Sequence, residues 1–337
     1  MKNNSCGGFA SAQFLFALFF LSSLSMGTAF FLSSVIKTEG SFRRTGAATA
    51  EIDAILEAIL ADLSADPSPE INGPDDPVLN WNGETGKGYT ISVRPLSDRL
   101  NPNFIRKNIF EKTKLMELLN PGTTPDGLQQ FREDHGLSLV SQDYEDFFSP
   151  GVFQKYLSPY GWANINLIDE FALRQLVRSL TGSEHLAEEI RNKVQILLIN
   201  QERVSGETLR SFLGIDYGSL FPFINAEPLM NVNHTEPLLL KEIIAYPDYR
   251  ITGAEIKYQD LAARLSREAL DIHQVMEILD IDRTHPVLNY LGSITWFWEI
   301  IITGNKLSCR TVVCRLPPED PSLSEPAQFR IIEQRYE

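Results

Sequence analysis

The amino-terminal segment constrains the fold more than any other part of the 337-residue sequence. No charged residue lies between Lys2 and Lys37, and the stretch from Phe9 to Ile36 consists mainly of Phe, Leu, Ala and Ser. As an α-helix it would be ~42 Å long, against ~30 Å for the hydrocarbon core of a bilayer. Cleavable secretory signals have apolar regions of only ~7–15 residues. The segment therefore predicts one membrane-spanning helix, and cleavage near the small residues at 27–29 is the alternative.

The helical pattern continues beyond this segment but becomes amphipathic. Between residues 47 and 63, small and apolar residues recur at helical spacing with acidic residues between them. Pro67 and Pro69 end the pattern. We therefore expect one long helix over 9–65, with its first part in lipid and its second part packed on a protein core. Hydrophobic residues make up 43% of the chain, which is enough for such a core.

Strand patterns lie on both sides of a large helical region. Tyr89, Ile91 and Val93 alternate with polar residues, after a stretch over 66–88 that is typical of a loop. Near the other end, three segments are strand candidates because they are rich in aromatic and β-branched residues: 294–303, 307–316 and 329–336. From about residue 103 to 282 the periodicity is mainly helical. If the flanking strands form one antiparallel sheet, the helical region is an insertion into it.

A short asparagine motif recurs within the helical region. Asn-x-Asn precedes a helical pattern at three places: Asn101 and Asn103, Asn164 and Asn166, and Asn231 and Asn233. Asn side chains can hydrogen-bond their own nearby backbone and tolerate turn geometry. We therefore interpret the motif as a structural entry to each helix. The apolar pattern predicts helices around 173–180, 186–197, 209–213, 240–244 and 272–279, arranged as helix-turn-helix units.

The sequence contains no arrangement that predicts catalysis. The five His residues do not occur at metal-ligand spacing, and there is no Gly-x-Ser-x-Gly motif. Two acidic clusters carry oxygen ligands of the kind that calcium prefers, but neither has the EF-hand spacing. Their members are Asp66, Glu70, Asp75 and Asp76, and Asp143, Glu145 and Asp146. We therefore expect a protein that is not an enzyme, with metal ligands unassigned.

Two of the three cysteines lie on one predicted strand. Cys309 and Cys314 are an odd number of positions apart, which places them on opposite faces and ~16 Å from each other. A disulfide needs Cα atoms within ~7 Å. Both residues are therefore predicted to be free thiols, with one of them in the core.

The first eight residues resemble the leader of a prepilin. They are short and polar and end at Gly8, where the apolar run begins abruptly at Phe9. In that family a membrane peptidase cuts after the Gly, so the resemblance implies Phe9 as the mature N-terminus. The fifth mature residue would be Gln13, where ordinary pilins and pseudopilins have Glu. The minor pseudopilin K family of type II secretion typically lacks this Glu, and the order of the parts in this chain resembles that family.

The resemblance to the minor pseudopilin K family implies an α+β fold. A long N-terminal transmembrane helix precedes a pilin-like antiparallel sheet, which carries a large inserted all-α domain of helix-hairpin-helix-like units. In that family an Asn-x-Asn segment opens each helical unit. The expected division of the chain is a leader over 1–8, a spine helix over 9–65, a sheet domain over 66–102 and 286–337, and an inserted helical domain over 103–285.

The same resemblance implies a structural role in protein export. The chain would be a minor pseudopilin at the tip of the pseudopilus, assisting pseudopilus assembly. It would span the inner membrane once, with its bulk in the periplasm. Its partners would be other minor pseudopilins, the major pseudopilin, the prepilin peptidase and membrane lipid. The family is known to bind calcium in this domain, which makes calcium the candidate ion.

Three alternative functions match parts of the sequence. A minor pilin of a type IV pilus or DNA-uptake filament would share the leader and the helix. An exported globular protein would have an ordinary signal peptide, cleaved near 27–29. A helix-hairpin-helix DNA binder is disfavoured, because 30 Lys and Arg against 44 Asp and Glu give a net charge of −14 and the turn at 182–184 is acidic. We therefore expect no nucleic-acid partner.

Overall fold

The structure is a computed structural model. It describes residues 46–337 except for 67–70, 86–87, 137, 139, 169, 201–202, 215–219, 221–222, 306 and 317–326. The predicted leader and membrane segment, with Gly8, Phe9 and Gln13, lie outside the described residues. The chain divides into two compact units, 1–57 and 58–337. In the first unit residues 46–57 are helical, and the second unit begins with helical residues 58–64. Within the described part of the chain, no helix has the length and hydropathy needed to cross a bilayer.

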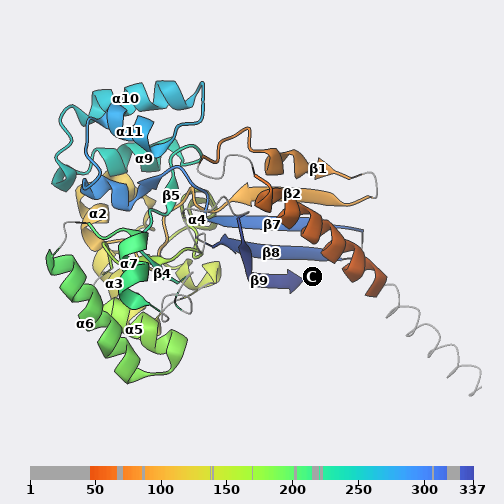
Figure 1. The fold of residues 1–337 in the computed structure, drawn as a ribbon, viewed down its shortest axis with the longest axis horizontal. Coiled ribbons are helices and arrows are strands. Elements are labelled where there is room, and N and C mark those ends of the chain that lie inside the picture. Colours follow the sequence, from red (N-terminus) through yellow and green to blue (C-terminus); the bar gives the residue numbers. More distant parts are fainter. Residues whose placement is uncertain are drawn as a thin grey trace, which may run out of the picture. The chain divides into compact units, whose positions relative to one another are not determined.

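The second unit contains a five-stranded antiparallel sheet beside the helical block (Figure 1). In spatial order its strands are β1 (Gly83–Glu84), β2 (Thr90–Pro95), β7 (Phe297–Thr303), β8 (Ser308–Arg315) and β9 (Phe329–Tyr336). Strand β2 pairs directly with β7, although the whole helical block separates them in the sequence. The protein therefore combines helices with an antiparallel sheet, and strands from both sides of the helical block share that sheet.

Side-chain alternation along the strands matches the sequence pattern. Ile91 and Val93 are buried, whereas Thr90 and Ser92, which alternate with them, are exposed. The register of β7 with β8 places Cys309 and Cys314 on opposite faces of the sheet. Both thiols are free, as predicted. Both are also buried, whereas the sequence pattern predicted one of them in the core. Burial raises the pKa of the Cys314 thiol, so this group stays protonated.

Two segments depart from their predicted structure. Strand β7 begins at Phe297, later than its apolar pattern, and the N–H groups of the preceding Thr295 and Trp296 donate to the side chains of Asn72 and Ser97. The predicted loop over 66–88 contains β1 and a short 3-10 helix, η1 (Pro77–Trp81). The Asp76 carboxylate caps η1 by accepting from the N–H of Val78, so the turn residues of this stretch start a helix.

The helical block lies between β2 and β7 in the sequence. Its α-helices include α2 (Lys107–Lys112), α3 (Pro125–His135), α4 (Pro150–Tyr156), α5 (Glu170–Thr181), α6 (Glu184–Asn200), α7 (Gly206–Leu213), α9 (Pro237–Ile244), α10 (Ala254–Leu265) and α11 (Ile272–Leu279). Further 3-10 turns are η2 (Lys114–Leu118), η3 (Ser141–Tyr144), η4 (Pro247–Tyr249) and η5 (Pro286–Asn289). The local sequence fixes where several of these helices begin. Thr124 caps α3 ahead of Pro125, and Asp271 forms a capping box with Gln274 at the start of α11.

Two buried clusters form the core of the second unit. One joins the first and last parts of the helical block, from Leu100 to Leu157 and from Met230 to Leu291. The other joins the middle part of the block to the sheet. In this second cluster the Trp162 ring contacts the rings of Trp296 and Phe297, with centroids 5.1 and 5.4 Å apart. The sheet and the middle helices therefore share one core.

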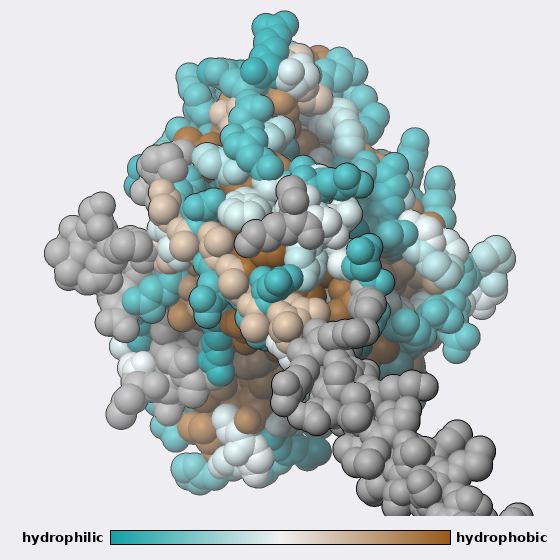
Figure 2. Space-filling model, turned by 90° about the vertical axis from the view of Figure 1, so that its right-hand side faces the viewer, coloured by the Kyte–Doolittle hydropathy of each residue, from teal (hydrophilic) through white to brown (hydrophobic). Residues whose placement is uncertain are grey.

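One face of the molecule mixes residue types. On the face shown in Figure 2, hydrophilic and hydrophobic residues are interspersed. The sequence as a whole has a net charge of −14 and a pI near 4.9. An acidic protein of this kind repels polyanions over a Debye length of about 8 Å at physiological salt.

Candidate functional site at the asparagine turns and the sheet junction

The three Asn-x-Asn motifs adopt the same local geometry. In each motif the side-chain Oδ1 of the first Asn accepts a hydrogen bond from the backbone N–H of the second. The distances are 2.9 Å at Asn101, 2.9 Å at Asn164 and 3.0 Å at Asn231. This bond is an Asx turn, which Asn favours because its side chain reaches its own backbone two residues on. The motif thus fixes the chain direction ahead of the following helix.

The second Asn of each motif forms two hydrogen bonds to one distant backbone position. Its Nδ2 donates to the carbonyl and its Oδ1 accepts from the N–H of the same residue, as a paired strand would. The pairs are Asn103 with Ser138 (3.0 and 3.0 Å), Asn166 with Val204 (2.9 and 2.9 Å) and Asn233 with Leu270 (3.0 and 2.8 Å). We call these pairs the amide clasps. Each clasp closes the loop of one helical unit.

The first Asn of each motif links its unit to a distant segment of the chain. Nδ2 of Asn101 donates to the carbonyl of Pro159, and Nδ2 of Asn164 donates to that of Asn289 at 3.0 Å. Nδ2 of Asn231 donates to the carbonyl of Asn72 at 2.8 Å. The chain that precedes the motif also pairs in parallel with the end of its unit. These pairs are Leu100 with Leu157, β3 (Ala163–Asn164) with β4 (Ile224–Asn225) and β5 (Met230–Asn231) with β6 (Leu291–Gly292). The helical block therefore consists of three related units.

A buried polar junction connects the third unit to the sheet. The Ser97 hydroxyl accepts from the N–H groups of Trp296 and Phe297, at 2.9 and 3.0 Å. The Ser97 carbonyl accepts from the backbone N–H of Asn231, and the Asn231 Nδ2 also donates to Thr295 Oγ1 at 2.9 Å. Ser97, Asn231 and Thr295 are fully buried. Buried polar groups that are all satisfied fix one arrangement. The junction therefore sets the orientation of the third unit on the sheet.

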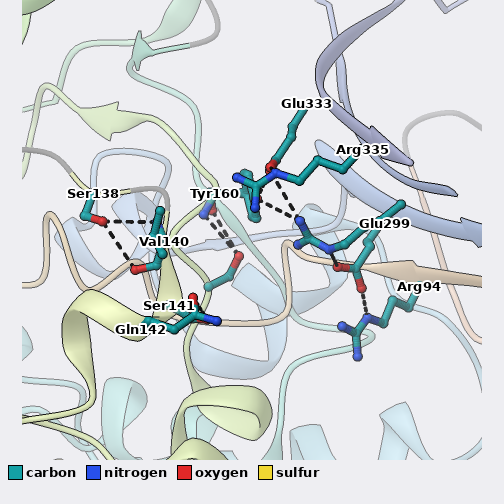
Figure 3. A network of polar contacts seen from close by, with 11 residues as sticks. Arg94, Ser138, Val140, Ser141, Gln142, Tyr160, Glu299, Glu333 and Arg335 are labelled. Atoms are coloured by element: carbon teal, nitrogen blue, oxygen red, sulfur yellow. Dashed lines mark hydrogen bonds and ion pairs between the residues drawn. The ribbon is translucent and has the colours of Figure 1, made fainter. Parts of the chain in front are cut away.

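An ionic network crosses one face of the sheet (Figure 3). Glu299 is only 1% exposed and pairs with Arg94 on β2 and with Arg310 on β8, the latter at 2.7 Å. Arg310 also donates to the Tyr160 hydroxyl oxygen at 3.0 Å and lies 3.3 Å from Glu333. Tyr160 belongs to the helical block, and its hydroxyl donates to Glu333 on β9. The network therefore fastens the block to strands β8 and β9 of the sheet.

The described acidic residues do not gather around a metal. The Asn72 amide donates to Asp66 and Asp76, and the Ser138 hydroxyl donates to Asp143. Glu70, from the first predicted cluster, lies outside the described residues. Across the part of the chain that the structure describes, no three His, Cys, Asp or Glu side chains come together to hold a metal ion. Neither cluster is therefore assigned as a set of calcium ligands.

Two buried titratable groups make stability depend on pH in opposite directions. Burial lowers the pKa of His234 from 6.5 to about 4, and its Nε2 has no hydrogen-bond partner among the described residues. Burial also raises the pKa of Asp98 to about 6, with Arg99 opposing the shift. His234 therefore favours the folded state above pH 6.5 and loses this contribution as the pH falls towards 4. Protonation of Asp98 favours the folded state as the pH falls below 6.

We predict that His234→Gln removes the first of these dependences. At pH 4.5 the wild-type chain loses about 2–3 kcal/mol through His234 that the variant retains. The difference in free energy of unfolding between variant and wild type should therefore shift in favour of the variant by about this amount between pH 7 and 4.5. Urea titrations at both values measure it, and Asp98 cancels because both proteins contain it. A constant difference across this range would contradict the assignment.

Comparisons with known proteins give similar solved structures but no match by sequence. No protein-family model matches the chain, and no curated protein sequence matches it. Among solved structures, a chain of the GspK–GspI–GspJ complex of the type 2 secretion system from enterotoxigenic Escherichia coli aligns with it. The alignment covers 88% of this chain and 98% of that chain, at 14% identity and a TM-score of 0.36.

Proposed function

We propose that the chain is a minor pseudopilin of a type II protein secretion system, without an enzymatic reaction of its own. The observation that carries the proposal is the order of its parts. A short polar leader precedes a long uncharged segment, and a sheet follows whose strands β2 and β7 pair across an inserted helical block. A filament subunit of this kind needs a membrane helix for assembly and a folded domain to present at the surface.

The asparagine turns and the ionic network suit a structural role. Both consist of side chains that fasten segments of the same chain to one another. A protein that transmits contacts between neighbours requires a helical block held rigidly on its sheet. In this proposal, the helix would pack against other pseudopilins in the inner membrane, and the folded part would lie in the periplasm. Calcium remains an expectation that comes from the family resemblance.

The proposal places the protein at the tip of the pseudopilus. Gln13 has no carboxylate to pair with the N-terminal amine of a neighbouring subunit, and an unpaired ammonium in lipid is expensive. At the tip no such neighbour is required. The helical block between β2 and β7 is also bulky, so copies stacked at close axial steps would collide. The runner-up function is a minor pilin of a type IV pilus or DNA-uptake filament, because it would share the leader and the helix.

Immunogold labelling of overexpressed pseudopili tests the position, and the major pseudopilin serves as the control. We expect label for this chain only at filament ends, with continuous label for the major pseudopilin. Gln13→Glu should leave this pattern unchanged because the helical block still prevents stacking. Label along the whole filament would contradict the tip position. Co-purification with a type IV pilus instead of the type II secretion system would favour the runner-up.

A further inference from the structure

A groove of about 820 Å³ lies between the first and second helical units. Helices α2 and α3 form one side, and α5 with the turn before it forms the other. Neither the amide clasps nor the ionic network closes this space. A cavity of this size is within the range of ligand-binding clefts, ~300–1,000 Å³.

The wall formed by α5 presents an exposed aromatic side chain to the groove. The helix buries Leu173 and Val177 in the core, but Phe171 lines the groove and is 49% exposed. Ile168 and Leu167, which are partly buried, continue this apolar surface. An apolar side chain placed on Phe171 would remove this surface from water.

The opposite wall carries a positive charge that faces no carboxylate. Arg106 Nε donates to the carbonyl of Leu167 at 2.6 Å, and its Nη2 donates to that of Asn166 at 3.2 Å. These bonds hold the guanidinium in place without neutralising it, and in the described structure Arg106 has no ion pair. Three carboxylates also line the groove: Glu111 pairs with Lys107, whereas Glu133 and Asp134 accept from the neutral amides of Gln129 and Gln130 and keep their charge. The four cations of the lining, Arg106, Lys107, Arg132 and Arg178, outnumber these carboxylates.

A buried acceptor lies beside this charge. Asn108 lines the groove, but its Oδ1 atom is inaccessible to solvent and has no hydrogen-bond donor among the described residues. A buried acceptor without a donor is unfavourable, and most such atoms in folded proteins have a partner. Because the atom is inaccessible to solvent, a ligand in the groove does not reach it.

We propose that this groove binds an extended acidic peptide segment of a partner protein. An apolar side chain of the segment covers Phe171, and an adjacent carboxylate pairs with Arg106. The charge complementarity is local, since the chain as a whole has a net charge of −14 and would repel an acidic segment elsewhere. The proposal does not depend on the role in secretion, because it rests on the groove alone.

Selection from a phage-displayed random dodecapeptide library on the detergent-solubilised full chain tests this proposal. We expect enrichment of peptides that combine Asp or Glu with an aromatic or large aliphatic residue. Fluorescence anisotropy of the most enriched peptide should then show about tenfold weaker binding to Phe171→Ser and to Arg106→Gln, and the Arg106 contribution should fall with added salt.

The chain offers matched controls outside the groove. Phe212 on α7 is 36% exposed, and Arg264 on α10 is partly exposed and pairs with Glu268. Phe212→Ser and Arg264→Gln should leave peptide binding unchanged. Equal binding by all four variants, enrichment of basic peptides, or absence of a consensus would overturn the proposal. Dimerisation of the full chain that displaces the peptide would assign the groove to a second copy and would also overturn it.

Discussion

Replacing Asn231 by Leu is expected to lower the free energy of unfolding by about 4 kcal/mol, the largest effect of any single substitution proposed for this protein. The Asn231 side chain is fully buried and makes three hydrogen bonds, to the Asn72 carbonyl, to Thr295 Oγ1 and from the Asn233 N–H. Leu has a similar volume but leaves each of these buried partners unsatisfied, at ~1–3 kcal/mol apiece. Because the junction joins the third helical unit to the sheet, both should lose stability together.

Urea unfolding, followed by circular dichroism and by tryptophan fluorescence, measures this effect. Asn80 provides the control because it is exposed on η1, and Asn80→Leu should change stability by less than about 0.5 kcal/mol. A loss below 1 kcal/mol for Asn231→Leu would mean that the junction does not hold the third unit on the sheet.

Glu299→Gln is expected to destabilise the fold by about 3 kcal/mol. The carboxylate is 1% exposed and pairs with Arg94 and Arg310, whose side chains are 35% and 30% exposed. Neutralising it leaves two like charges close together at a partly buried site, although both can recover some hydration. Since the Glu299 carboxylate is buried, 1 M salt should change this loss only slightly.

An exposed ion pair of the same type is the control. Glu189 pairs with Lys193 on α6 at 2.9 Å, and Glu189→Gln should cost less than about 0.5 kcal/mol. Combining Glu299→Leu with Arg94→Leu and Arg310→Met should restore much of the lost stability, because apolar residues of similar volume can replace a buried ionic cluster. A loss for Glu299→Gln that equals the Glu189 control would contradict the buried network.

Periodicity alone predicted most of the regular structure that the described residues show. The helices α5, α6, α7, α9 and α11 and the strands β2, β7, β8 and β9 each coincide with a sequence pattern. Helices α2, α3, α4 and α10 were not predicted individually. Helix α10 buries Leu261 while exposing Ile256 at 66% and so has no continuous apolar face. Its position depends on tertiary contacts that a local pattern does not contain.

The sequence alone predicted only some of the polar contacts. The Asn-x-Asn motif could be found because it acts through the Asn side chain, but its clasp partners Ser138, Val204 and Leu270 share no residue type, since they bond through the backbone. Glu299 did leave a signal, as a lone acidic residue within an otherwise apolar strand. Its partner Arg94 could be identified only once the register of β2 with β7 was known.

The role as a minor pseudopilin is tested most directly by the mature N-terminus of the protein. Intact-mass and N-terminal peptide mass spectrometry should be carried out on the chain from cells with and without the prepilin peptidase. The proposal predicts that the chain begins at Phe9 when the peptidase is present and at Met1 when it is absent, and that Gly8→Leu blocks the conversion. A chain that begins at Phe30, or at Met1 in cells that contain the peptidase, would contradict it.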